Sequence, residues 1–251
     1  MSRSSNKRES PLGWEASLAF CPPEGSPLLG AAAGGDDAPP AEEEQKAVTR
    51  RYDRMAPLYD LYNAPMEWMG FRRRRRRLLA KARGRVLEVG VGTGKNLSHY
   101  PSGVELTAID VSKSMLERAR RRAEKLDMSA TFNLADVTAL PYPDDSFDTA
   151  VATAVFCSVA DPVTGLREMA RVTKPDGQIL LLEHVRPRNS LLGWLADLIT
   201  VLTRRLFGFR ANRRTEENVV AAGLEVVDIR REGIWREIVA RPGRPAAETE
   251  D

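Results

Sequence analysis

Residues that can bind or act on a small molecule recur in the chain at the ends of short apolar runs. Gly90, Asp110, Asp136, Thr153 and His184 each close such a run. Carboxylates accept hydrogen bonds from hydroxyl and amino groups, and histidine exchanges a proton near neutral pH. In a parallel α/β sheet, ligands bind beyond the carboxyl ends of the strands. The sequence therefore predicts one site built from the ends of five strands.

The first of these runs leads into three alternating glycines, Gly90, Gly92 and Gly94, within the stretch 85–96. Glycine permits a sharp turn with positive φ and lets a ligand approach where a Cβ would interfere. A helix is predicted to begin at Lys95, and its N-terminus would favour an anionic group. The stretch predicts a nucleotide-type pocket, and a glycine turn that serves only packing is the alternative.

The spacing of the glycines separates the nucleotide sites. A dinucleotide fingerprint needs a third glycine where Lys95 stands, and a phosphate-binding P-loop needs Ser or Thr where Asn96 stands. The remaining pattern, E-x-G-x-G-x-G, resembles the first motif of class I S-adenosylmethionine (SAM) methyltransferases. Glu88 would then face the ammonium group of the ligand.

Two further acids fit such a ligand. Asp110 lies 20 positions after Gly90, where nucleotide sites place a carboxylate for the ribose hydroxyls. Asp136 can accept from an adenine amino group, while Val137 and Leu140 pack against the ring.

Strands and helices alternate along the chain, and several strands are apolar throughout. This pattern predicts a parallel sheet covered on both faces. Beyond the run at 85–89, the predicted strands are 103–110, 130–135, 147–153, 178–185, 224–230 and 233–241. The predicted helices are 41–63, 65–83, one from 95, one capped by Ser112, 162–172 and 215–222. A turn is predicted at 174–177.

Two other segments carry a family resemblance together with the glycine motif. Residues 59–63 (YDLYN) and 171–177 (RVTKPDG) resemble the ubiquinone/menaquinone C-methyltransferase superfamily, over roughly residues 48–240. Tyr62, Asp176 and Val185 depart from that pattern. Segments 155–159, 183–185 and 208–212 are more similar to the related phospholipid N-methyltransferases and methyltransferase-like thiol methyltransferases.

The resemblance implies a Rossmann-like α/β fold of class I, with a seven-stranded, mostly parallel sheet, an antiparallel last strand and helices on both faces. It implies SAM as cofactor, with Tyr59 reaching over it, and no metal. His184 is the candidate general base, and a structural histidine is the alternative. The residues expected to bind SAM are Tyr59, Glu88, Gly90, Gly92, Gly94, Asp110, Val111, Met115, Asp136, Val137 and Thr153.

Length and composition place the chain among globular proteins. Its 251 residues are 42% apolar and carry a net charge of +3. Cys21 and Cys157 lie far apart, which favours a reducing compartment without structural disulfides. No segment has the pattern of a signal peptide or membrane span, so we expect a cytoplasmic protein, and a transit peptide is the alternative. Residues 1–41 are predicted to be a disordered tail, 42–242 the methyltransferase domain and 243–251 a flexible tail.

The acceptor of the methyl group is predicted to be small and hydrophobic or lipid-like: a quinol, a phospholipid amine or a thiol. The chain has the apolar residues 153–156 after the fourth strand, in place of the [ND]-P-P-[YF] motif of enzymes that methylate nucleobases. Nucleic acid is therefore not expected as a partner. A SAM-binding scaffold without catalysis and a nicotinamide-dependent reductase are the alternatives, and Lys95 disfavours the second.

Two segments have sequence patterns that fit more than one role. Segment 191–207 has an apolar stripe at helical spacing, typical of a lid, of a helix that contacts a membrane surface, or of core packing. The six arginines at 72–77 cannot share one face of a helix. A solvated surface is the favoured interpretation of this run, and a patch for anionic lipid or ligand is the alternative.

Overall fold

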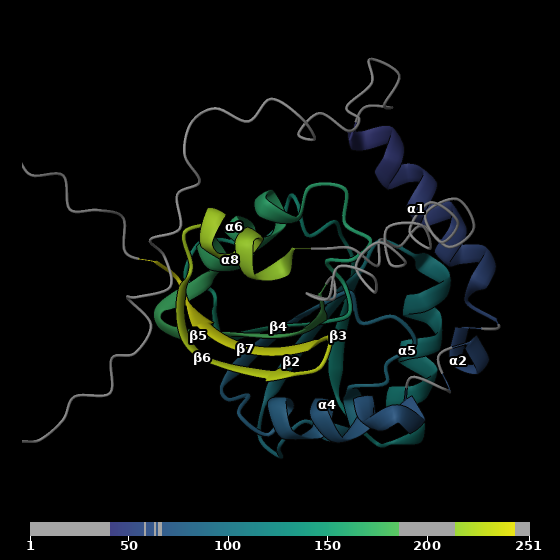
Figure 1. Ribbon diagram of the computed structural model, residues 1–251. Coiled ribbons are helices and arrows are strands. Elements are labelled where there is room, and N and C mark those ends of the chain that lie inside the picture. Colours follow the sequence, from purple (N-terminus) through teal and green to yellow (C-terminus); the bar gives the residue numbers. More distant parts are fainter. Residues whose placement is uncertain (1–40, 58, 63, 65–66, 186–213, 244–251) are drawn as a thin grey trace, which may run out of the picture. The chain divides into compact units, whose positions relative to one another are not determined.

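The computed structural model describes residues 41–57, 59–62, 64, 67–185 and 214–243, which form a seven-stranded sheet flanked by helices (Figure 1). The strand order is β3-β2-β1-β4-β5-β7-β6, and β7 runs antiparallel to both of its neighbours. The predicted seven-stranded, mostly parallel sheet is confirmed. The strands are β1 (Arg85–Val89), β2 (Glu105–Asp110), β3 (Ala130–Leu134), β4 (Phe147–Thr153), β5 (Thr173–His184), β6 (Glu225–Glu232) and β7 (Trp235–Arg241).

Helices lie on both faces of this sheet, with α6 and α8 on one side and α4 on the other (Figure 1). Their starts follow from local capping: the Ser112 hydroxyl accepts from the Met115 N–H at α5, and Asp161 accepts from the Thr164 N–H at α6. The helices are α1 (Ala41–Met55), α2 (Tyr59–Tyr62), α4 (Arg72–Leu79), α5 (Lys113–Lys125), α6 (Pro162–Val172) and α8 (Thr215–Ala221), with a π turn η2 (Glu67–Phe71) and a 3₁₀ turn η3 (Leu97–His99).

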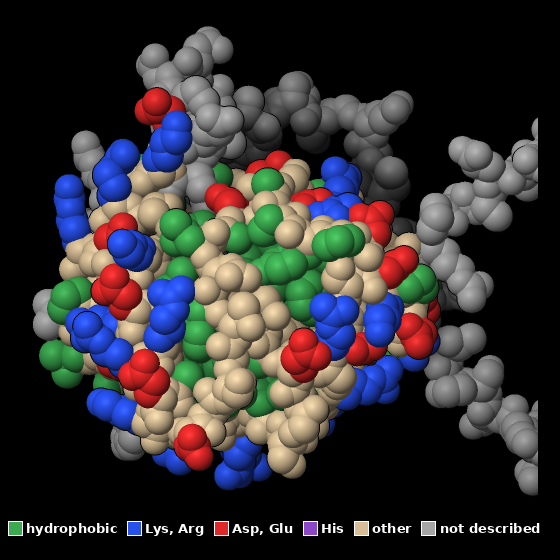
Figure 2. Space-filling model, turned by 180° about the vertical axis from the view of Figure 1, so that it is seen from behind, with side chains coloured by type: hydrophobic (Ala, Val, Ile, Leu, Met, Phe, Trp, Pro, Cys, Tyr) green, Lys and Arg blue, Asp and Glu red, His purple; other side chains and the backbone are tan. Residues whose placement is uncertain are grey.

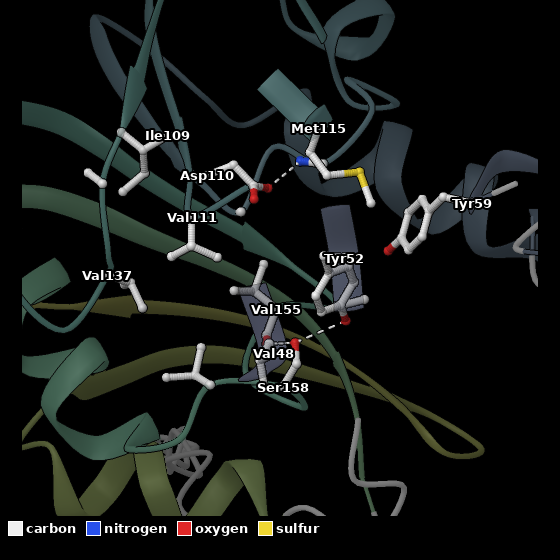
Figure 3. A pocket seen from close by; sticks show the side chains of 15 residues that line it. Val48, Tyr52, Tyr59, Ile109, Asp110, Val111, Met115, Val137, Val155 and Ser158 are labelled. Carbon is white, nitrogen blue, oxygen red and sulfur yellow. Dashed lines mark hydrogen bonds between the residues drawn. The ribbon is translucent and has the colours of Figure 1, made fainter. Parts of the chain in front are cut away.

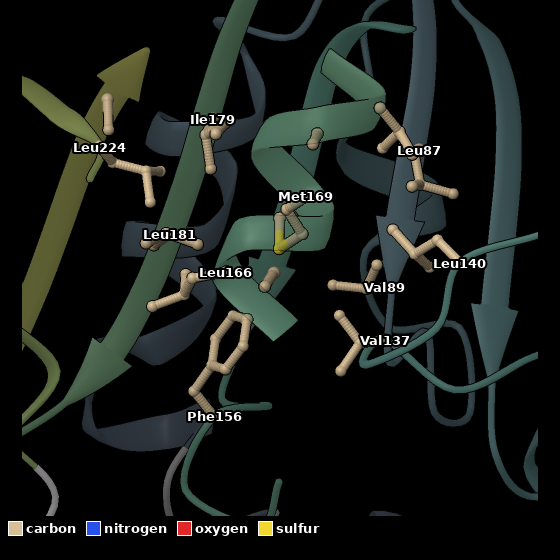
Figure 4. Close-up of a cluster of buried hydrophobic side chains, with 14 of the residues drawn as sticks. Leu87, Val89, Val137, Leu140, Phe156, Leu166, Met169, Ile179, Leu181 and Leu224 are labelled. Carbon is tan, nitrogen blue, oxygen red and sulfur yellow. The ribbon is translucent and has the colours of Figure 1, made fainter. Parts of the chain in front are cut away.

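Alternating residues of the central strands form two separate layers of core. On one face, Leu166 and Met169 of α6 pack against Val89 and Leu181 (Figure 4). On the other face, Phe71 and the end of α4 pack against buried apolar residues of the strands. A strand that is buried on both faces needs apolar residues at every position, which explains the unbroken apolar runs in the sequence.

Three predicted helices are shorter than expected, and a glycine or proline accounts for each. The helix predicted over 41–63 breaks between α1 and α2, because Pro57 lacks an N–H group and restricts the residue before it. The helix predicted over 65–83 is divided into η2 and α4, and Gly70, with φ of +95°, lies within η2 just before α4 begins.

The helix predicted from Lys95 is only the three-residue turn η3. Pro101 holds Tyr100 in an extended conformation, with ψ of 143°, so the helix cannot continue. The glycine turn is therefore not followed by a long helix whose dipole could hold an anion.

The turn predicted at 174–177 lies inside β5. Thr173 pairs with Phe147, but the next pair is Thr149 with Gln178, so the intervening residues of β5 form an irregular bulge. The strand therefore begins five residues earlier than the predicted one, and the residues typical of a turn occupy the bulge.

The arginine run divides into side chains with different surroundings. Arg72, Arg73 and Arg76 are exposed, whereas Arg75 is buried with 6% of its surface exposed. Arg77 donates to Glu237 of β7 and to Glu232 of β6. Elsewhere on the surface, basic and acidic side chains are interspersed around apolar ones on the face seen from behind (Figure 2).

Parts of the sequence analysis concern residues that lie outside the described ones: the predicted tails 1–40 and 244–251, and segment 191–207. Among the helices of the described residues, none is long and apolar enough to cross a membrane.

Candidate cofactor site

A cavity of about 70 Å³ lies beyond the carboxyl ends of the central strands (Figure 3). One side is aliphatic, with Ile109, Val111 and Val137, and the N-terminal helices place Tyr52 and Tyr59 on another side. Seven of the residues predicted to bind cofactor line this cavity: Tyr59, Gly90, Gly92, Asp110, Val111, Met115 and Val137.

Tyr52 was not among the predicted residues, although it stands seven positions, about two helical turns, before Tyr59 in the sequence. The two rings are in edge-to-face contact with centroids 6.0 Å apart. The Tyr52 hydroxyl donates to Ser158 Oγ at 3.2 Å, which joins α1 to the loop after β4. Burial raises the pKa of Tyr52 well above its ordinary value, so its hydroxyl stays protonated.

Asp110 lies at the end of β2 and is almost fully buried. Its two oxygens accept from the Gly92 and Ser112 N–H groups, both at 2.9 Å, so the carboxylate also shapes the glycine turn. Burial raises the pKa of Asp110 to about 6, and the nearby Asp53 adds to this rise. Its remaining lone pairs can accept from ligand hydroxyls at the cavity.

Glu88 lies behind the glycine turn, outside the residues that line the described cavities, and 1% of its surface is exposed. Its oxygens accept from Asn96 Nδ2 at 2.7 Å and from the Tyr100 hydroxyl at 2.9 Å. Burial raises the pKa of Glu88 to about 7. This position supports the turn rather than offering the carboxylate to a ligand ammonium group, which was its predicted role. Gly94 also lies outside the lining residues.

Asp136 lines a neighbouring cavity that shares Val111 and Ala135 with the first. One of its oxygens accepts from the N–H and hydroxyl groups of Thr138, both at 2.9 Å, which fixes the carboxylate at the rim. Val137 and Leu140 both belong to the hydrophobic core, and of the two only Val137 also lines the first cavity.

A small polar cavity of about 40 Å³ adjoins the first and shares Tyr59, Gly90, Gly92 and Ala154 with it. It contains the predicted residue Thr153, which accepts from Asn96 Nδ2 at 3.1 Å. Its charged residues, Glu67, Arg75 and Lys95, were not predicted. No pattern in the sequence distinguishes Arg75 from the other five arginines of the run at 72–77.

His184 lies at the end of β5, half-buried, outside the residues that line these cavities. Ligand atoms of Cys157, Glu183 and His184 lie within 4.8 Å of one another, close enough to hold a metal ion. Glu183 also accepts from the N–H groups of Val155 and Phe156, so it shapes the loop that borders the first cavity.

The geometry fits SAM at two places. Gly92 has φ of +54°, and a Cβ built on it would point toward Tyr59 at 3.9 Å, within the space where a ligand would lie. The Nε of Arg75 is buried without a hydrogen-bond partner among the described residues. An apolar cavity with an acid for hydroxyls, beside a polar one with both signs of charge, matches a nucleoside joined to an amino acid.

The strand order and the glycine turn define the class: a Rossmann-like methyltransferase fold. The family described as "Methyltransferase domain" matches residues 87–181. A phosphatidylethanolamine N-methyltransferase of Cereibacter sphaeroides is 38% identical over 184 residues, which is 72% of this chain and 89% of that protein. A demethylmenaquinone methyltransferase of Renibacterium salmoninarum is 38% identical over 146 residues, which is 56% of this chain and 60% of that protein.

A solved SAM-dependent methyltransferase from Methanosarcina mazei has the same fold, with a TM-score of 0.53 at 23% identity. That likeness covers 64% of this chain and 93% of the other. The chain belongs to the SAM-dependent methyltransferases.

Proposed function

We propose that the protein transfers the methyl group of SAM to a small hydrophobic or lipid-like acceptor, at a site lined by Tyr59, Gly92, Asp110 and Val137. The observation that carries this proposal is the junction of the apolar cavity with the polar one across the glycine turn. The similarity to enzymes named for a phospholipid amine and for a menaquinone precursor supports an acceptor of this kind.

Bound SAM would supply a methyl group on a sulfonium for an in-line displacement in which the acceptor takes the methyl group and S-adenosylhomocysteine is the leaving group. The chain's own contribution is alignment and exclusion of water, which in favourable cases lowers a barrier by roughly 7–11 kcal/mol. Tyr52 and Tyr59 exclude water from the cavity, and Asp110 orients the ribose. A cytoplasmic location with peripheral membrane contact would give access to a lipid acceptor, and Figure 2 displays apolar side chains between charged ones on one face.

The proposal is tested by incubating the protein with SAM radiolabelled in its methyl group and three acceptor classes: quinols, phospholipid amines in vesicles, and thiols. We expect label to enter one class, and the Asp110→Ala variant to lose this activity. If the protein binds S-adenosylhomocysteine but labels none of the three, a SAM-binding scaffold becomes the better proposal. Vesicle flotation of the same samples tests the membrane contact, and release at high salt is expected if arginines contribute.

His184 is proposed as the general base for an acceptor that loses a proton, because it lies at a strand end with an imidazole suited to proton transfer. The His184→Ala variant should lower turnover by about 10²-fold while the affinity for S-adenosylhomocysteine stays unchanged. The matched control is His99→Ala, at the other histidine of the chain. Unchanged turnover at every pH between 6 and 8 would assign His184 a structural role.

A further inference from the structure

The polar cavity beside the glycine turn contains opposite charges held close together. Arg75 donates to Glu67 Oε1 at 2.8 Å, and Lys95 Nζ lies 3.8 Å from the same oxygen. All three side chains are at least four-fifths buried. Ions buried in a protein are costly unless they are paired. These three charged side chains therefore cannot be explained as an ordinary solvated surface.

Arg75 retains binding capacity after its protein contacts are made. Its Nη1 donates to Asn96 Oδ1 at 2.9 Å and its Nη2 to Glu67, whereas its buried Nε has no hydrogen-bond partner among the described residues. Burial lowers the pKa of Arg75, although Glu67 and Glu88 act in the opposite direction. Arg75 lines the polar cavity and has an unused N–H, and a guanidinium group is suited to a carboxylate, which it binds by charge-assisted hydrogen bonds.

Two other groups that could hold an amino-acid ligand are not placed to do so. The helix predicted after the glycine turn is only η3, so no long helix dipole faces the cavity. Glu88 has its oxygens engaged by Asn96 and Tyr100 and does not line the cavity. The acid that does line it is Glu67.

We propose that Glu67 and Arg75 recognise the amino-acid end of the cofactor, with the guanidinium of Arg75 binding the carboxylate and Glu67 binding the ammonium. Lys95 adds positive charge near the carboxylate. This inference rests on the proposed SAM site and extends it to specificity. The protein should select donors that have both a free carboxylate and a free ammonium group, and should discriminate against decarboxylated SAM.

The test compares two ligands by calorimetry. S-adenosylhomocysteine has the amino-acid end, whereas 5′-methylthioadenosine has the nucleoside but lacks that end. Arg75→Gln should weaken S-adenosylhomocysteine binding at least about tenfold, because a hydrogen-bonded charge is lost, and leave methylthioadenosine within about twofold. The matched control is Arg76→Gln, the exposed neighbour in the same run, which should change neither affinity.

Glu67→Gln is the second variant, and it carries the test if Arg75→Gln does not fold. It should reduce the preference for S-adenosylhomocysteine over 5′-methylthioadenosine in the same way. Equal weakening of both ligands would mean that Arg75 only supports the glycine turn through Asn96, and it would overturn the inference. Unchanged affinities in both variants would also overturn it. If the wild-type protein binds neither ligand, the proposed SAM site itself fails, which is a separate result.

Discussion

The glycines of the turn after β1 are required for different physical reasons. A Cβ on Gly94 would lie 2.8 Å from Leu97 Cδ1 and 3.1 Å from the Ala119 backbone, so the protein itself occupies that space. A Cβ on Gly92 would meet Tyr59 only at 3.9 Å, in the cavity. Both have positive φ, which costs a substituted residue about 1–2 kcal/mol.

Substitution by alanine should therefore separate binding from stability. Gly92→Ala should lose S-adenosylhomocysteine binding while the free energy of unfolding falls only by the cost of positive φ. The free energy of unfolding should fall by about 1–3 kcal/mol more in Gly94→Ala, because the new Cβ overlaps with protein atoms. Urea unfolding and calorimetry on both variants check this, and tight binding by Gly92→Ala would place the ligand elsewhere.

Asp110 is a second single residue with a testable effect, because it should make cofactor binding depend on pH. Its pKa of about 6 in the free protein means that the carboxyl is mostly protonated at pH 5. Ribose hydroxyls favour the ionised form, so binding at low pH must also remove the proton. S-adenosylhomocysteine should bind about tenfold more weakly at pH 5 than at pH 7.5. Calorimetry should find this dependence absent in Asp110→Asn, and an unchanged dependence there would exclude Asp110 as its source.

At the scale of elements, Asp60 holds α2 in place beside the cavity. Asp60 accepts from Thr93 Oγ1 and Arg122 Nη2, both at 2.6 Å, and lies 3.6 Å from Lys95 Nζ. Burial alone would raise the pKa of Asp60, but the hydrogen bond from Thr93 and the charge of Arg122 bring it below its ordinary value. Tyr59 of α2 lines both the apolar and the polar cavity, so these contacts of Asp60 hold Tyr59 beside the proposed cofactor site.

Loss of this fastening should speed ligand release. Asp60→Ala should raise the dissociation rate of S-adenosylhomocysteine several-fold, because opening breaks fewer contacts. Arg122→Gln should do the same in part, and the effects of the two should not add, since they remove one shared contact. Stopped-flow displacement measures the rates, with the exposed Lys125→Gln on α5 as control. Fully additive effects would contradict a shared contact.

The same elements show what the sequence could predict. The bounds of β4 and α6 were predicted to the residue, because apolar runs and caps are local signals. The inward direction of Arg75 and the contact between Tyr52 and Ser158, 106 positions apart, depend on how distant elements pack. Neither leaves a periodic trace in the sequence. The breaks at Pro57 and Pro101 could have been predicted from proline geometry alone.

For the whole molecule, the two buried carboxyls with raised pKa values, Glu88 and Asp110, should make stability fall as pH rises toward neutrality. Glu88 holds its proton up to about pH 7 in the folded chain, against an ordinary value of 4.5, so between these values the folded state binds more protons than the unfolded state. The contribution is complete below pH 4.5 and lost as pH rises through 7, by at most about 3 kcal/mol.

Urea unfolding at pH 5.5 and 7.5 measures this effect. The free energy of unfolding should fall less between these pH values in Glu88→Gln than in the wild type, because glutamine has no proton to lose. Asp110 contributes in the same direction, so Asp110→Asn is the companion variant. An identical decrease in wild type and Glu88→Gln would show that Glu88 is ionised throughout.

The position of β7 in the sheet determines when the fold can be completed during synthesis. This last strand lies between β5 and β6, and β6 pairs with no other described strand. While the ribosome still holds the residues of β7, β5 presents an unpaired edge and β6 has no partner. A premature stop before Trp235 would therefore divide the sheet rather than trim its edge. Nascent chains of this protein are most exposed to edge-to-edge association before β7 leaves the ribosome.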